Sequence, residues 1–547
     1  MELLPTRATF APGDEVAVEV RGAGGALTLA LWHLDAQIAR IELAAGDSLA
    51  RFGNLPAGGY GVEAVVASAG DDAADPAGRV AARTALDVLP DPLARPRYGF
   101  VSDYAPGRDV AGVADQARRL HLNAVQFYDW MYRHARLLPP AGAAKEPDRT
   151  FGDALGREVS LGSVQRLVDA VHGAGSLAFG YAAVYAVGRE AWPEWRDHGL
   201  FHPDGRPWTL GQDFLWNVDP TSEPWLRHFT AELRASRESV GFAGFHLDQY
   251  GAPKRALRAD GSRVDLAAAF PALVGRVAAE VPGARIIFNN VNDFPTWSTA
   301  GPPQAATYIE VWPPHTRLAH LGGLVARARA LAPGTAPILA AYLSAYEGDE
   351  AAASAAERLA LATAWSHGGG ALLHGEADAV LTEAYYVRHA RLGAASLDAT
   401  RRSYDFAVRY GDLLFDASAI DVTRTELGGV NQEIRVEAPV DVGSDGDAGT
   451  LWVRALRGAR GLVLHLIDLS GQDDDRWDAG KRPPAGLSGV HVHVQRDGPR
   501  PPRFLFADPD ASPAMRALPS RPEGEHDVVE LPRLGAWALL WVTDGGA

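Results

Sequence analysis

From Arg97 to about residue 410 the sequence alternates between short apolar runs and longer amphipathic ones. Amphipathic helical patterns cover residues 109–120, 161–173, 265–280, 318–332 and 352–366. This alternation predicts parallel strands joined by crossover helices, and eight strand–helix units in about three hundred residues predict a (β/α)₈ TIM barrel. The eight expected strands are 98–102, 124–130, 177–184, 242–248, 285–290, 307–312, 338–343 and 371–375.

The segments on either side of this region contain strand patterns without helical ones. Residues 16–20 and 26–32 alternate in hydrophobicity, 84–89 resembles a closing strand, and 68–78 is expected to be a loop. Short strands at regular spacing predict a β-sandwich before the barrel, and seven further strand patterns predict an antiparallel β-domain after it. The chain is therefore expected to be a multidomain α/β protein with domains at 1–92, 93–412 and 413–547.

Composition argues against several kinds of partner. The formal net charge is −16, which disfavours nucleic acids and anionic membranes, and no apolar run approaches the length of a membrane span. The chain has no cysteine, so disulfides and thiolate metal sites are excluded. Its N-terminal residues lack a basic segment followed by an apolar one, so a cytoplasmic location is expected, although an exported protein without its signal would look the same. The oligomeric state is left open.

Polar and aromatic residues gather near the carboxyl ends of the predicted strands, where barrel enzymes build their active sites. Carboxylates perform acid–base chemistry, amides and histidines hydrogen-bond to hydroxyl groups, and aromatic rings stack on sugar rings. This combination indicates a carbohydrate site, although any single ring is equally compatible with barrel core. The candidate substrate-binding residues are Gln126, Tyr128, Asp129, Trp130, Tyr132, His134, Tyr181, Tyr185, His246, Asn289, Asn290, Trp312, Tyr342, His374 and Glu376.

Two carboxylates are the strongest catalytic candidates. A glycine-interrupted apolar run ends at Asp248, at the tip of the fourth expected strand, and Glu310 lies near the end of the sixth. Two carboxyl groups flanking a glycosidic bond are the usual requirement for glycoside hydrolysis. Apolar neighbours of Glu310 would raise its pKa by desolvation, as a general acid needs. For Asp248 the alternative role is to cap the next turn or helix.

A metal site is the competing chemistry. His246 and Asp248 face the same side of one strand and would make a ligand set with His374, but such His-x-Asp spacing is common by chance. His198 and His202 are spaced like zinc ligands, yet the glutamate of a zinc-protease helix is missing. No convincing glycine-rich loop opens a helix, as a phosphate site would require. We therefore expect neither a metal nor a cofactor.

Three stretches at these strand ends resemble glycoside hydrolase family 66. Residues 126–134 read Gln-Phe-Tyr-Asp-Trp-Met-Tyr-Arg-His, and 241–251 and 308–312 surround the two carboxylates. The resemblance implies an immunoglobulin-like N-terminal domain, a (β/α)₈ barrel and a C-terminal Greek-key β-domain. It also implies a retaining mechanism on α-1,6-linked glucan, with Asp248 as nucleophile and Glu310 as acid/base.

The leading hypothesis is a retaining, dextranase-type hydrolase of dextran or isomaltooligosaccharides. The alternatives are a glucanotransferase that makes cyclic or longer isomaltooligosaccharides, and a non-catalytic carbohydrate-binding barrel. The retaining mechanism predicts that the carboxyl groups of Asp248 and Glu310 lie about 5–5.5 Å apart in one pocket.

Overall fold

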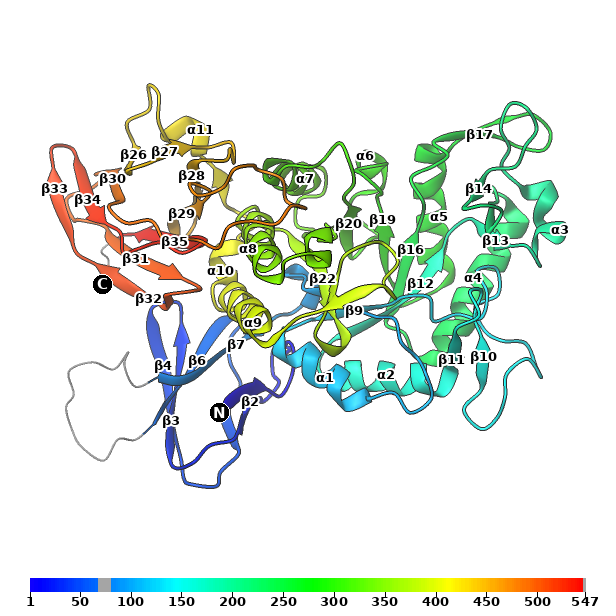
Figure 1. Ribbon diagram of the computed structural model, residues 1–547, viewed down its shortest axis with the longest axis horizontal. Coiled ribbons are helices and arrows are strands. Elements are labelled where there is room, and N and C mark those ends of the chain that lie inside the picture. The colour runs from blue at the N-terminus through cyan, green and yellow to red at the C-terminus, as the bar shows by residue number, and fades with distance from the viewer. Residues whose placement is uncertain (67–79, 545–547) are drawn as a thin grey trace.

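The computed structural model describes residues 1–66 and 80–544, so the loop expected at 68–78 lies outside the described residues. Figure 1 shows a barrel with its helices in the centre and right of the molecule and two β-domains at the left. None of the helices described is long and apolar enough to cross a membrane.

The centre of the molecule is a closed barrel of eight parallel strands. The sheet runs β21-β20-β19-β16-β12-β9-β8-β22, and pairing of β21 with β22 closes it. This confirms the predicted (β/α)₈ fold. The strands are β8 (Tyr98–Val101), β9 (Ala124–Phe127), β12 (Leu177–Ala183), β16 (Gly244–Asp248), β19 (Arg285–Asn289), β20 (Ala306–Glu310), β21 (Pro337–Ala340) and β22 (Gly370–Gly375).

The helices that cover the barrel begin at clear local signals. The side chains of Asp109, Ser160, Asp265 and Asp349 each accept a hydrogen bond from a backbone N–H in the first turn of the helix that follows. The principal helices are α1 (Val110–Arg119), α2 (Leu161–Gly173), α4 (Glu223–Val240), α5 (Leu266–Glu280), α7 (Leu318–Leu331), α8 (Glu350–Ser366) and α9 (Ala394–Arg409).

Seven of the eight barrel strands are shorter than predicted, and at two of them, β16 and β9, the backbone shows why. Helix α4 ends at Val240 and is capped by Gly241, whose φ of 89° lies in the left-handed region that favours glycine, so β16 begins only at Gly244. Strand β9 ends at Phe127 because the chain turns at Asp129, which has a φ of 49°. This turn directs the following residues away from the line of the strand.

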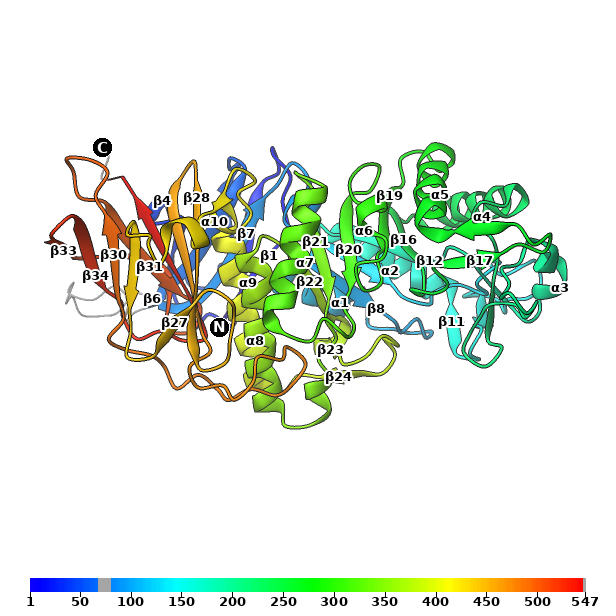
Figure 2. The ribbon, with the colours of Figure 1, turned by 90° about the horizontal axis from the view of Figure 1, so that it is seen from above.

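The loops after the strands carry small elements of their own. These elements follow β9, β12, β16 and β22 in sequence, and several of them form the right-hand end of the molecule in Figures 1 and 2. They are β10 (Thr150–Gly152), β11 (Glu158–Ser160), β13 (Ala186–Gly188), α3 (Trp192–Trp195), β14 (Thr209–Leu210), β15 (Leu215–Asn217), β17 (Arg255–Leu257), β18 (Arg263–Asp265), β23 (Ala379–Leu381) and β24 (His389–Arg391).

The N-terminal domain is a sandwich of two antiparallel sheets. One sheet has the order β1-β2-β5 and the other β4-β3-β6-β7, with Val18, Leu29 and Val62 fully buried between them. This is the predicted immunoglobulin-like arrangement. The strands are β1 (Glu2–Pro5), β2 (Val16–Arg21), β3 (Leu27–His33), β4 (Ala36–Leu43), β5 (Leu49–Gly53), β6 (Gly58–Val66) and β7 (Val80–Val88).

The C-terminal domain also consists of two sheets around a buried apolar core. Its central pairs, such as β29 with β35, join strands that are far apart in sequence. The larger sheet contains β25 (Ile420–Asp421), β27 (Asp441–Gly443), β28 (Thr450–Gly458), β29 (Gly461–Asp468), β31 (Arg503–Asp508), β32 (Ser512–Leu518) and β35 (Trp537–Thr543), and the smaller contains β26 (Ile434–Glu437), β30 (His491–Gln495), β33 (Ser520–Glu523) and β34 (His526–Glu530).

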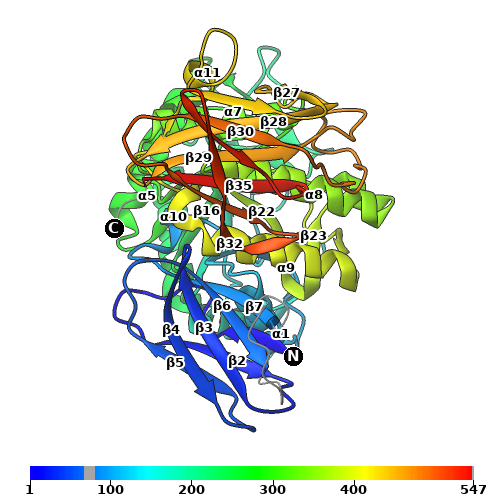
Figure 3. The same cartoon turned by 90° about the vertical axis from the view of Figure 1, so that its left-hand side faces the viewer.

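The two β-domains lie beside each other at one end of the molecule, as Figure 3 shows. Arg503 reaches Asp35 across them at 2.6 Å. The end of α9 joins the barrel to the N-terminal domain, because Arg409 contacts Glu63 at 3.0 Å. In the following turn, Asp412 accepts the backbone N–H of Gly59. The buried contacts of Arg409 and Asp412 hold the barrel against the N-terminal domain.

Candidate active site

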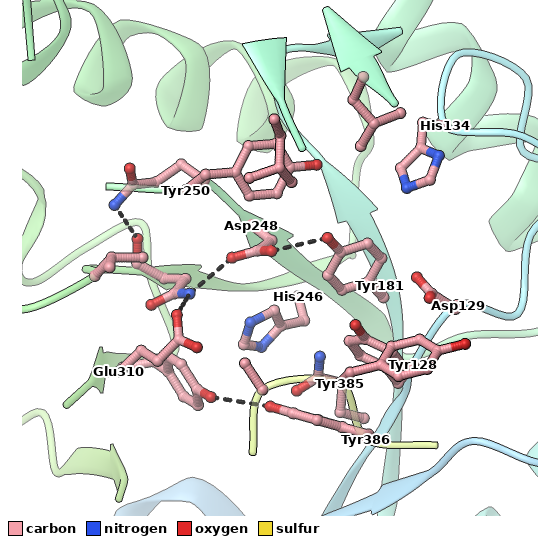
Figure 4. A pocket seen from close by; sticks show the side chains of 18 of the residues that line it. Tyr128, Asp129, His134, Tyr181, His246, Asp248, Tyr250, Glu310, Tyr385 and Tyr386 are labelled. Carbon is pink, nitrogen blue, oxygen red and sulfur yellow. Dashed lines mark hydrogen bonds between the residues drawn. The ribbon is translucent and has the colours of Figure 1, made fainter. Parts of the chain in front are cut away.

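A cavity of about 320 Å³ opens among the loops and carboxyl ends of the barrel strands. Figure 4 shows carboxylates, tyrosines and histidines converging on it. Its lining comprises Gln126, Tyr128, Asp129, His134, Leu155, Tyr181, Leu210, Phe214, Leu215, His246, Asp248, Gln249, Tyr250, Asn289, Val291, Tyr308, Glu310, Trp312, Tyr342, Ala384, Tyr385 and Tyr386.

Asp248 and Glu310 both line this cavity, at the ends of β16 and β20. Strand β19 lies between those two strands, so its last residue, Asn289, lies between the two carboxylates. The Asn289 amide nitrogen donates to Asp248 Oδ1 at 2.7 Å and to Glu310 Oε2 at 2.9 Å. Each carboxylate also has a donor of its own: Tyr181 donates to Asp248 at 2.8 Å and Tyr342 to Glu310 at 2.9 Å.

The surroundings of the two carboxylates favour their protonated forms. Burial, together with the nearby charge of Glu310, raises the pKa of Asp248 to about 7, against the opposing hydrogen bonds from Asn289 and Tyr181. Burial likewise raises the pKa of Glu310. Two like charges this close are costly in a buried site, so ionisation of one carboxyl group disfavours ionisation of the other. One ionised and one protonated carboxyl group is the state that acid-assisted glycoside cleavage requires.

Asp129 is a third carboxylate in the cavity. Its left-handed backbone turns the side chain inward directly after β9, where the closest cation is Arg157, 3.6 Å away. Burial raises the pKa of Asp129 to about 7, which the Arg157 charge opposes and Asp153 reinforces. Among residues 1–66 and 80–544, the Asp129 carboxylate accepts no hydrogen bond, so it can accept one from a ligand.

Aromatic rings form the walls of the cavity. Tyr128 stacks on Tyr386 with 4.3 Å between ring centroids and lies 5.3 Å from Tyr181. Trp312 is 38% exposed and meets Tyr342 edge to face. Such surfaces fit the apolar faces of sugar rings, and the tyrosine hydroxyl groups can hydrogen-bond to their edges.

His246 lies at the base of the cavity among tyrosine rings. Its Nδ1 is 3.2 Å from the Tyr98 hydroxyl, and burial lowers its pKa to about 3, so the ring is neutral. His374 faces the other way, toward Glu357, and the ligand set of His246, Asp248 and His374 is therefore not assembled. Within residues 1–66 and 80–544, no group of three or more His, Cys, Asp or Glu side chains has an arrangement suited to a metal ion.

Six of the predicted site residues do not line the cavity. Trp130 is fully buried, donates its indole N–H to the Tyr181 carbonyl and packs on Phe242, because the turn at Asp129 directs it away from the barrel axis. Tyr132 instead packs edge to face on Phe151.

The other four have structural partners. The Tyr185 hydroxyl accepts the backbone N–H of Tyr250, and Asn290 donates to the Tyr308 carbonyl at 2.9 Å. His374 bonds to Glu357 of α8 at 2.9 Å. Glu376 accepts the backbone N–H and the hydroxyl of Ser102, which ties the last barrel strand to the first. These side chains support the barrel from outside the cavity.

Half of the lining residues were not predicted from the sequence. Tyr385 and Tyr386 follow the short strand β23, beyond the expected end of the last barrel strand. Two consecutive tyrosines after a barrel strand were the only feature of the sequence that could have indicated a role in the site. Tyr250 lies two residues beyond Asp248, in the loop that follows β16. The lining residues not predicted are Leu155, Leu210, Phe214, Leu215, Gln249, Tyr250, Val291, Tyr308, Ala384, Tyr385 and Tyr386.

A closed barrel with two adjacent buried carboxylates in an aromatic cavity has the architecture of a glycosidase-type enzyme. The sequence model of Glycosyl hydrolase family 66 matches residues 5–541. The chain therefore belongs to glycosyl hydrolase family 66.

Two relatives from Niallia circulans are both cycloisomaltooligosaccharide glucanotransferases. One is 28% identical over 376 residues, which cover 62% of this chain and 37% of the relative. The other is 26% identical over 306 residues, which cover 49% and 31%. The chain thus matches only about a third of the length of these curated relatives.

Solved structures share the fold. A cycloisomaltooligosaccharide glucanotransferase from Paenibacillus sp., crystallised with cycloisomaltoheptaose, superposes with a TM-score of 0.85 at 18% identity and covers 99% of both chains. The maltogenic α-amylase AmyB from Thermotoga neapolitana gives a TM-score of 0.51 at 10% identity, covering 82% of this chain and 99% of the other. At these identities the comparison concerns the fold alone.

Proposed function

We propose that this chain is a retaining glycosidase that hydrolyses α-1,6-glucosidic linkages of dextran or isomaltooligosaccharides. The observation that supports this best is the bridge made by Asn289. The carboxylate oxygens that it joins cannot be more than about 5.6 Å apart, because both accept from one amide nitrogen, at 2.7 and 2.9 Å. Retaining glycosidases separate their carboxyl groups by about 5–5.5 Å, whereas inverting enzymes need about 6.5–9.5 Å to admit a water.

In the proposed mechanism the two carboxyl groups have different roles. Ionised Asp248 attacks the anomeric carbon while Glu310 gives its proton to the glycosidic oxygen, so the C–O bond breaks and a glycosyl-enzyme ester forms. Glu310, now ionised, takes a proton from water as the water oxygen attacks the same carbon and releases Asp248. The raised pKa of Glu310 suits a group that must be protonated before the first step.

The cavity offers hydrogen-bonding groups for an uncharged, hydroxyl-rich ligand. Four buried polar atoms of its lining have no partner in the described structure: Gln126 Oε1, His134 Nδ1, Tyr250 Oη and Asn289 Oδ1. A buried polar group without a partner is costly, so ligand hydroxyl groups would satisfy these atoms. Among the described lining residues there is no lysine or arginine, which disfavours phosphates and other anions.

Transfer to another sugar is the second candidate, favoured by the names of the curated relatives. A sugar hydroxyl would then replace water in the second step and be deprotonated by Glu310. The exposed side chains of Trp312, Leu155 and Leu210 give the cavity rim apolar surfaces against which an acceptor sugar can pack. Both candidates use the same covalent intermediate.

Product analysis tests the proposal. Incubation with dextran, and separately with isomaltooligosaccharides of defined length, is expected to yield shorter linear products whose sizes chromatography and mass spectrometry give. Rings or chains longer than the substrate would establish transfer. Binding of these substrates without any turnover would contradict both candidates and leave a non-catalytic carbohydrate-binding barrel.

A further inference from the structure

Asn289 occupies an unusual position, since one side chain contacts both candidate catalytic groups. It is 3% exposed, and its backbone is fixed by pairing of β19 with β16 on one side and β20 on the other. The backbone carbonyl oxygen of Asn289 accepts a hydrogen bond from the side-chain amide of Gln249 at 3.1 Å. The side chain therefore stands on a rigid support between the two carboxylates.

The amide oxygen of Asn289 is left without a hydrogen-bond partner among the described residues. Both amide hydrogens are used by Asp248 and Glu310, and Asn289 Oδ1 is buried without a partner in the described structure. An asparagine can accept two hydrogen bonds at this oxygen.

We propose that Asn289 is a positioning residue that holds the nucleophile and the acid/base at one fixed separation. This inference rests on the proposed function and deepens it. Asparagine suits the role because its NH₂ group offers two hydrogens from one atom, whereas a hydroxyl group has only one to offer.

The arrangement makes a specific prediction about protonation. Burial raises the pKa of both carboxyl groups, and donation by Asn289 opposes this in each. Tyr181 donates to Asp248 alone, and Tyr342 to Glu310 alone. Removal of the Asn289 donor should therefore change the pKa of both carboxyl groups. Removal of the Tyr181 or the Tyr342 donor should change the pKa of only one of them.

Other titratable groups face the pair from the surrounding elements. They are seven tyrosines, His246 and Asp129. Burial raises the pKa of each tyrosine above its usual value and lowers that of His246, so none of these eight side chains changes charge near neutral pH. Asp129 titrates near neutral pH, but it does so in the wild type and in all the variants compared. The groups are Tyr98, Tyr128, Asp129, Tyr181, His246, Tyr250, Tyr308, Tyr342 and Tyr386.

The test is the pH profile of kcat/KM on an isomaltooligosaccharide. Its acid limb reports ionisation of the nucleophile, and its alkaline limb reports loss of the proton from the acid. Asn289→Ala should move both limbs to higher pH and lower kcat about a hundredfold through misplacement of the pair. Tyr181→Phe should move only the acid limb, and Tyr342→Phe only the alkaline limb.

The matched control is Asn290→Ala, on the next residue, whose side chain bonds to backbone rather than to a carboxylate. It should lower the melting temperature and leave both limbs in place. If Asn289→Ala fails to fold, Asn289→Asp keeps the shape and removes both N–H donors, so both limbs should again move upward. A uniform loss of rate with unmoved limbs would reduce Asn289 to a packing role and overturn the inference.

A second readout separates this inference from the proposed function. Carboxyl ¹³C NMR of protein labelled at Asp and Glu follows the ionisation of Asp248 and Glu310 with pH and needs no turnover. The variants Asp248→Asn and Glu310→Gln assign the two signals. If the wild type cleaves no glucan but Asn289→Ala still raises the pKa values of both carboxyl groups, the proposed function is wrong and the positioning role of Asn289 is supported. If the wild type is active and Asn289→Ala changes neither pKa value, only the positioning role of Asn289 is contradicted.

Discussion

Asp248→Asn is expected to lose turnover of natural glycosides almost completely, while Glu310→Gln is expected to lose about 10²–10⁴-fold, the usual contribution of a general acid. The first variant cannot form the covalent intermediate. The second keeps its nucleophile but cannot protonate the leaving oxygen. Initial rates on an isomaltooligosaccharide measure both losses, and circular dichroism checks that the fold is kept.

An activated substrate separates the two roles. A glycosyl fluoride needs little acid assistance, so Glu310→Gln should still form the glycosyl-enzyme and then stall because water lacks a base. Added azide needs no base and should restore turnover, giving the α-azide with retained configuration. Asp248→Asn should give at most the inverted β-azide.

The reverse outcome would be equally informative. Retained azide from Asp248→Asn and none from Glu310→Gln would show that the two roles are exchanged. Undiminished activity in both variants would mean that this pair is not catalytic, and Asp129 would become the next candidate nucleophile.

Asp129→Ala is expected to reduce kcat/KM by about 10–100-fold, the usual value of a hydrogen bond to a charged group, while leaving the fold intact. The reason is that the Asp129 carboxylate faces the cavity and is not closely paired there, since Arg157 is 3.6 Å away. Steady-state kinetics on isomaltooligosaccharides measure the loss.

Asp153→Asn is the matched control, because Asp153 bonds to Arg157 at 2.7 Å and is absent from the cavity lining. It should disturb the neighbouring ion pair and retain most of the activity. Wild-type kinetics in Asp129→Ala would assign Asp129 a structural role instead.

The barrel was predictable because its strands are apolar and bounded by clear breaks. All eight expected strands are present, and the boundaries differ where the backbone turns, as at Gly241 and Asp129. The positions of Asp248 and Glu310 followed from the same pattern, since strands four and six of a closed barrel end at the same face. Proximity of the two carboxylates was therefore a consequence of topology.

The direction in which individual side chains point was much harder to predict. Trp130 is only one residue beyond Asp129, yet the left-handed turn buries its ring outside the cavity. His374 is on a barrel strand but faces α8, because successive strand residues point to opposite sides. Tyr386 enters the site from a loop whose path depends on tertiary contacts with Tyr308 and Tyr342.

The most direct test of the central claim is the anomeric configuration of the first product. Proton NMR of wild-type enzyme acting on an isomaltooligosaccharide, recorded before mutarotation, should show the α-anomer appearing first, with the β-anomer growing only later. This follows from two displacements at one carbon, by Asp248 and then by water. Initial appearance of the β-anomer would establish a single displacement and contradict the proposed roles of Asp248 and Glu310.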